Sequence, residues 1–124
     1  MKIILPTTVA LKKGIFRLNL NAYRNANHYT LSEAKIRYQE IVAPLVQHLP
    51  KLSQISLSYE LFAGSARRMD VSNGCAIVDK FFSDSLVNLG YLPDDDYKHL
   101  LGVQYLFGSI DKGNPRVEVT IHPI

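Results

Sequence analysis

Residues 54–63 alternate between two kinds of side chain, and this alternation limits what the chain can fold into. Every second position is apolar, at Ile55, Leu57, Tyr59 and Leu61. A period of two places these side chains on one face of a β-strand, which then has to be covered by other elements. The chain is therefore expected to contain a sheet with one buried face.

Two other segments have the longer period of an amphipathic helix. The first begins at the capping-box pattern Thr30-Leu31-Ser32-Glu33 and ends before Pro50. Pro44 is expected to kink or break this helix, because proline lacks a backbone donor. The second helix covers about residues 75–89, and Gly90 is expected to be its C-terminal stop.

Further strands and loops follow from apolar patterns and turn residues. Strands are expected at residues 1–5, 14–20, 101–107 and 116–122, and loops at 19–29, 64–74 and 111–115. The resulting order is β-β-α-β-α-β-β. It predicts a single α+β domain over residues 1–124, with one mixed sheet and two helices packed on a face.

The composition is typical of one soluble globular domain. The 124 residues are 47% hydrophobic, and no apolar run approaches the roughly 18 residues that a membrane-spanning helix needs, so no membrane partner is expected. The single cysteine, Cys75, excludes an intrachain disulfide, fits a reducing cytoplasm, and is expected to be buried in its helix. The neighbouring pair Phe81-Phe82 is expected in the core and at a dimer interface.

Charged residues are clustered, although the formal net charge is only +3. Basic clusters lie at Lys12, Lys13 and Arg17, at Arg67 and Arg68, and at Lys112 and Arg116. One compact acidic cluster lies at Asp94, Asp95 and Asp96. Such a distribution would suit a protein that holds phosphates and a metal ion at once.

Acidic residues flank the second expected helix, with Asp70 before it and Asp94–Asp96 after it. Hydrolysis of a phosphodiester near neutral pH needs an activated water and stabilisation of transition-state charge, and Mg²⁺ held by carboxylates supplies both. A helix of about 15 residues is roughly 22 Å long, so the two positions meet only if the chain after Gly90 folds back along it. Otherwise, three consecutive aspartates indicate a solvated turn.

An ordered set of short motifs between Arg67 and Ile121 resembles the RusA family of Holliday-junction resolvases. The family pattern is basic-Asp-x-Asp-Asn, a Lys, Asp-x-Leu, a Gly, an Asp-Asp pair and Lys-Gly-x-Arg before a strand. The matching residues here are Asp70 and Asn73, Lys80, Asp84-Ser85-Leu86, Gly90, Asp94-Asp95, and Lys112-Gly113-Asn114-Pro115-Arg116, which is one residue longer. The segment from Asn19 to Tyr23 is similar to an Asn-rich family segment near the start.

This resemblance implies an endonuclease that uses Mg²⁺, or Mn²⁺, to make paired symmetric nicks in four-way junctions or other branched DNA during phage or prophage recombination. Paired nicks need two active sites and hence a homodimer. The implied catalytic residues are Asp70, Asp95 and Lys80, with Asp70, Asp95, Asp94 and Asp96 as metal ligands. The implied DNA contacts are Arg67, Arg68, Lys112 and Arg116.

Two departures from the family pattern leave the activity open. Ser72 stands where the family has its second aspartate, and the gap from Asn73 to Lys80 is four residues longer. Gly74 is expected to mark where this extra turn loops out. Asp79 is only a weak substitute for the lost carboxylate, because on a helix it points about 100° away from Lys80. The alternative that Ser72 favours is a branched-DNA-binding protein of the same fold that does not cut.

Several of these residues also have a purely structural interpretation. Asp70 or Asn73 could cap the second helix, and Asn73 could instead contact a metal-bound water, as could Ser72. Lys80 could form an ordinary ion pair with Asp84, one helical turn away. These alternatives depend on local geometry and remain open at the level of sequence.

Overall fold

A mixed sheet and three helices make up the computed structural model of the chain, which covers residues 1–124. The strands are β1 (Lys2–Leu5), β2 (Thr8–Ala10), β3 (Ile15–Arg17), β4 (Ile55–Ala63), β5 (Leu100–Ile110) and β6 (Arg116–Pro123). The helices are α1 (Leu20–Asn25), α2 (His28–Val46) and α3 (Val71–Asn88). The single α+β domain with a mixed sheet is confirmed, whereas β2 and α1 were not predicted.

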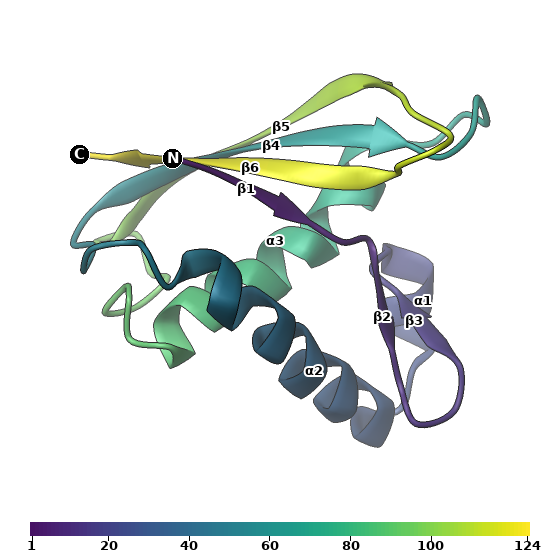
Figure 1. Cartoon of the computed structure of the whole chain (residues 1–124), viewed down its shortest axis with the longest axis horizontal. Coiled ribbons are helices and arrows are strands. Elements are labelled where there is room, and N and C mark those ends of the chain that lie inside the picture. Colours follow the sequence, from purple (N-terminus) through teal and green to yellow (C-terminus); the bar gives the residue numbers. More distant parts are fainter.

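Four strands form the main sheet in the order β1–β6–β4–β5, and β2 and β3 form a separate hairpin. β4 is antiparallel to β6 and parallel to β5. Parallel neighbours need a crossover connection, and α3 provides it between β4 and β5. α2 and α3 cover one face of the sheet and leave the other face open (Figure 1). No helix is both long enough and apolar enough to cross a bilayer.

The core lies between the sheet and its two covering helices. The alternation predicted for β4 is confirmed, because Ile55, Leu57, Tyr59 and Leu61 are buried while their neighbours are half-buried. Cys75 is buried in α3, as predicted. Phe81 and Phe82 of α3 are also buried, at 2% and 0% exposure. The prediction that this pair contributes to a dimer interface is wrong, because one chain already buries both rings.

Asparagine caps explain why residues 19–29, predicted as a loop, are largely helical. The Asn19 side chain accepts a hydrogen bond from the Ala22 N–H at 2.8 Å and caps α1. Asn27 caps α2 by accepting from the Thr30 N–H at 2.9 Å. Caps of this kind satisfy donors that have no partner within the helix. The strand predicted at 14–20 is correspondingly cut short to β3.

The start of α2 differs from the prediction, and the break that Pro44 could have caused is absent. Thr30 lies inside the first turn of α2 rather than at a capping box, and the carboxylate of Glu33 instead accepts from the Lys12 N–H at 2.7 Å. This contact ties α2 to the β2–β3 hairpin. Pro44 does not break α2, which continues to Val46. Pro44 lies in the last turn of α2. The backbone N–H that it lacks therefore removes a hydrogen bond only at the end of the helix.

α3 begins at Val71 rather than at the predicted Cys75, so the turn expected to loop out at Gly74 is helical. Gly74 is buried where α3 crosses β4. A Cβ atom at this position would lie 2.7 Å from Cδ2 of Leu61 and 3.2 Å from Cε of Met69. The glycine therefore allows a close approach of helix and sheet. At the other end of α3, Gly90 has a φ of +84° and ends the helix as predicted.

Replacement of Gly74 by valine is expected to destabilise the fold by about 1–3 kcal/mol, the usual cost of overpacking a core. Leu61 cannot yield easily, because it is itself buried. Urea unfolding followed by circular dichroism measures the change. Lys80→Val is the matched control, since it places the same residue on the exposed side of α3. Equal unfolding free energies for the two variants would contradict the close approach.

Candidate functional site

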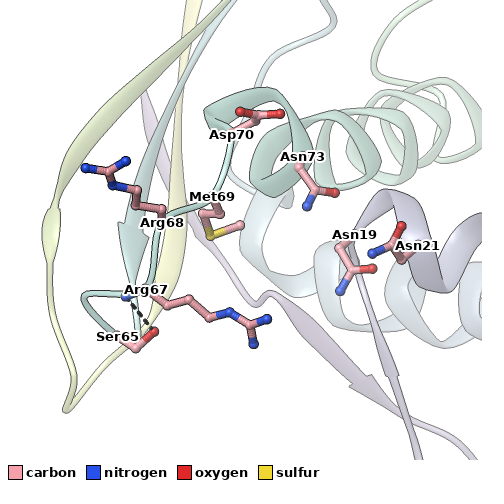
Figure 2. A pocket seen from close by; sticks show the side chains of 8 residues that line it. All are labelled: Asn19, Asn21, Ser65, Arg67, Arg68, Met69, Asp70 and Asn73. Atoms are coloured by element: carbon pink, nitrogen blue, oxygen red, sulfur yellow. Dashed lines mark hydrogen bonds between the residues drawn. The ribbon is translucent and has the colours of Figure 1, made fainter.

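A polar cavity of about 790 Å³ opens where three parts of the chain meet at one end of the sheet (Figure 2). The loop between β4 and α3, the start of α1 and the first turn of α3 enclose it. Met69 is its one hydrophobic lining residue. The others are Asn19, Asn21, Ser65, Arg67, Arg68, Asp70 and Asn73. Two arginines, three asparagines and one aspartate therefore line this cavity.

Asn73 fixes one wall of the cavity by holding α1 against α3. Its side-chain oxygen accepts a hydrogen bond from the Leu20 N–H at 3.0 Å, at the first residue of α1. The prediction that Asn73 caps its own helix is wrong, because α3 begins two residues before it and the cap position is Asp70. Asn19, the cap of α1, lies across from Asn73 in the cavity (Figure 2).

Asp70 holds the cap position of α3 without using its carboxylate as a cap. The side chain makes no capping hydrogen bond, and the residue is exposed. Its carboxylate therefore lies beside the partial positive charge of an 18-residue helix and remains open to solvent. Ser72 is exposed on the same first turn but does not line the cavity. Asp70 is thus the one carboxylate in this cavity.

Further cations surround the cavity because the turn between β5 and β6 packs against the β4–α3 loop. The Asp111 N–H donates to the Ala63 oxygen at 2.7 Å, which places the turn containing Lys112 beside this loop. Arg17 lines an adjoining cavity of about 140 Å³. Arg67 reaches toward the asparagines, whereas Arg68 points to the opposite side of the loop (Figure 2). Three basic segments far apart in sequence thus gather at one end of the molecule.

The guanidinium of Arg116, one of the expected DNA contacts, is already bound to carboxylates of the same chain. Its guanidinium donates to Glu118 at 2.7 Å and to Asp111 at 2.8 Å. The same group lies 4.1 Å above the centre of the Phe62 ring. This geometry holds the β5–β6 turn in place, so Arg116 positions Lys112 rather than offering a free cation.

The Arg116–Glu118 pair should make stability depend on pH. The hydrogen bond from Arg116 lowers the pKa of Glu118 below its ordinary value of 4.5. A carboxylate with a lowered folded-state pKa stabilises the fold above its unfolded pKa, and this contribution is lost as pH falls through the folded pKa. Glu118→Gln should therefore melt below wild type at pH 7, and the two melting temperatures should converge as pH falls below 4.5 and through the lowered pKa of Glu118. A difference that stays constant from pH 7 to pH 3 would contradict this role.

The acidic cluster lies at the opposite end of α3 from Asp70 (Figure 1). Between them stands a helix of 18 residues, roughly 27 Å long. The chain after Gly90 does not fold back, since Asp96 leads directly into β5 and its carbonyl accepts from the Leu100 N–H at 2.8 Å. Burial and the negative charge of Asp84 raise the pKa of Asp95. Within one chain, Asp94, Asp95 and Asp96 do not join Asp70.

Lys80 and Asp79 lie along α3 and outside the cavity. Lys80 is exposed and forms no ion pair with Asp84. Asp79 faces the sheet, where its carboxylate accepts hydrogen bonds from Tyr59 at 2.8 Å and Tyr105 at 2.6 Å. Asp79 is therefore a structural anchor between α3 and the sheet, which removes it as a substitute for the carboxylate missing at Ser72.

No three acidic, histidine or cysteine side chains converge where they could hold a metal ion. Asp70 alone does not make the carboxylate set that Mg²⁺ needs, so one chain does not fit the expected metal site. The sequence-based expectation also missed Asn19 and Asn21, whose proximity to Asp70 depends on α1. Neither the family models nor the curated proteins compared with this chain give a match, so its interpretation rests on geometry.

Proposed function

We propose that the protein binds DNA through the end of the molecule that carries the polar cavity. The observation that carries this proposal is a cavity beside the start of α3 that is lined by Arg67, Arg68 and three asparagines. Guanidinium groups, amides and helix N-termini are the usual contacts to phosphate oxygens. Arg17 and Lys112 extend the same basic surface, so more than one phosphate can be held at once.

Branched DNA is the substrate class that this surface suits best. The cations lie on separate loops around a hollow rather than along one helix, so they would contact backbones that approach from different directions. A flat row of cations would instead follow one duplex groove. The resemblance of the sequence motifs to junction resolvases supports the same choice.

Phosphodiester cleavage is a second candidate function, and the free carboxylate of Asp70 favours it. Mg²⁺ or Mn²⁺ bound there would supply the activated water, provided that further carboxylates reach the ion. A single chain does not place further carboxylates beside Asp70. Cleavage is therefore proposed only for an assembly in which Asp94–Asp96 of another chain approach the cavity, and binding without cleavage is the function proposed for the isolated chain.

A synthetic four-way junction tests both functions in one experiment. Binding is measured against a linear duplex of the same length in EDTA, and cleavage is then measured in Mg²⁺ and Mn²⁺. We expect tighter binding of the junction than of the duplex. Equal affinity for both DNAs would contradict the preference for branches, and no salt-sensitive binding of either would contradict the proposal. Cuts that disappear with Asp70→Asn would assign cleavage to this cavity.

A further inference from the structure

A smaller cavity of about 140 Å³ adjoins the polar cavity and differs from it in chemistry. Five of its 12 lining residues are hydrophobic, whereas the polar cavity has one. Two of the five, Leu18 and Leu61, are almost fully buried, at 3% and 4% exposure. The volume has room for about four or five water molecules, to which the leucines offer no hydrogen bonds. An occupant with an apolar face would therefore be held better than water.

The walls of the smaller cavity are held in place by the backbone. The β2–β3 hairpin pairs Thr8 with Arg17, and the Asn19 N–H donates to the Arg17 oxygen at 2.9 Å. Gly64 lies so close to the β5–β6 turn that an added Cβ would be 3.2 Å from Cβ of Pro115. All five residues line the cavity, which is therefore formed before any ligand arrives.

The charged and amide groups of this cavity are available as hydrogen-bond donors. The side-chain oxygen of Asn19 already accepts from the Ala22 N–H at 2.8 Å, which leaves its NH₂ group for a ligand. Arg17 forms no ion pair within the chain, and a guanidinium has donors only. No carboxylate lines the cavity. Its occupant should therefore combine an apolar face with an edge of hydrogen-bond acceptors.

The two cavities have a common boundary, because Asn19 and Met69 line both of them. Met69 comes from the loop before α3 and Asn19 from the start of α1, on opposite sides of the polar cavity (Figure 2). A ligand could therefore place a phosphate in the polar cavity and a covalently attached ring in the smaller one. A nucleotide has this composition. Among the bases, guanine carries two acceptors, O6 and N7, on one edge.

We propose that the two cavities together hold one unpaired nucleotide of the DNA, with its phosphate beside Arg67 and its base, guanine by preference, in the smaller cavity. This inference rests on the proposed function, because its phosphate contacts are those of the polar cavity. A base can enter only after it has left its base pair, and leaving costs least where the strands already separate. Capture of a single base would thus favour branched DNA over continuous duplex.

Three duplexes that differ at one extrahelical nucleotide test the proposal with the unmodified protein. The extra nucleotide carries guanine, adenine or no base, and the Kd of each duplex is measured by fluorescence anisotropy in EDTA. The guanine duplex should bind about tenfold tighter than the abasic duplex and about fivefold tighter than the adenine duplex. Equal affinity for the guanine and abasic duplexes would overturn the proposal, and equal affinity for guanine and adenine would overturn the choice of guanine.

The same experiment separates this inference from the proposed function. All three duplexes carry the same phosphates, so salt-sensitive binding without a base preference would contradict the inference alone. The absence of binding to any of them would contradict both.

A variant that fills the smaller cavity gives a second test. Thr8→Phe adds a ring at a lining position, whereas Ala10→Phe adds the same ring two residues further along β2, on the same face of the strand and outside the cavity. Thr8→Phe should bind the guanine and abasic duplexes equally, and Ala10→Phe should keep the tenfold difference. A difference that persists in folded Thr8→Phe would overturn the proposal. If Thr8→Phe does not fold, the comparison of duplexes with wild type decides.

Calorimetric titration with free deoxyguanosine monophosphate distinguishes a nucleotide within DNA from a free one. Neighbouring phosphates of DNA would also contact Arg68 and Lys112, so the guanine duplex should bind at least about tenfold tighter than the free nucleotide. Equal or tighter binding of the free nucleotide would assign the two cavities to a mononucleotide and overturn the proposal.

Discussion

Replacement of Arg67 and Arg68 together by glutamine is expected to weaken binding of a four-way junction by about 100-fold at 0.1 M salt. Both side chains line the polar cavity, and both are exposed. If each neutralises one phosphate, the slope of log affinity against log salt should become shallower by about 1.8. Fluorescence anisotropy of a labelled junction, measured over a series of KCl concentrations, gives both quantities.

A variant with the same loss of charge elsewhere provides the control. Lys35→Gln/Lys98→Gln removes two cations, one on α2 and one beside the acidic cluster, and neither lines the cavity. We expect its affinity to fall less than threefold and its salt slope to stay near wild type. If both double variants lost affinity equally, binding would depend on net charge alone, and the cavity would have no special role.

Replacement of Asp79 by alanine is expected to have the largest effect on stability, about 2–4 kcal/mol. The carboxylate accepts hydrogen bonds from Tyr59 at 2.8 Å, Ser83 at 3.0 Å and Tyr105 at 2.6 Å. Tyr59 is 0% exposed, and burial together with the charge of Asp79 raises its pKa. In Asp79→Ala, the buried Tyr59 hydroxyl would have no acceptor, and water could not replace it. The loss of stability should therefore exceed that of one exposed hydrogen bond.

Urea unfolding of three variants separates this network from a general effect of losing an aspartate. Asp79→Asn keeps an acceptor and should cost about half as much as Asp79→Ala. Asp84→Ala lies on the same helix next to the like charge of Asp95 and should cost less than about 0.5 kcal/mol. A similar loss in Asp84→Ala and Asp79→Ala would show that the tyrosine network contributes little.

Sequence patterns predicted those elements whose signals are local. The alternation in β4 and the stop at Gly90 hold in the structure, because strand period and a left-handed C-terminal residue depend on neighbours in the chain. The start of α3 could not be predicted. A run containing Gly74 reads as a loop until the close contact with Leu61 is known, and that contact joins distant segments.

In the candidate site, too, local sequence patterns predicted some residues, whereas contacts between distant segments were not predictable. Arg67, Arg68 and Asp70 share one short loop, so the sequence could predict that they lie close together. The link from Asn73 to α1 joins residues 53 positions apart, and no spacing rule contains it. The acidic cluster was expected to join Asp70 if the chain after Gly90 folded back along α3, but that chain turns into β5 and leaves the length of α3 between them.

The place of β6 in the sheet has a consequence for synthesis of the protein on the ribosome. β6 lies between β1 and β4, although it is the last strand in the chain. The first strand synthesised therefore has no neighbour until residues 117–120 have left the ribosomal exit tunnel and pair with residues 2–5. β4 and β5 can pair earlier, but the four-stranded sheet cannot be completed before β6 is available. β1 and the free edge of β4 stay unpaired until then, and the nascent chain is most susceptible to aggregation in this interval.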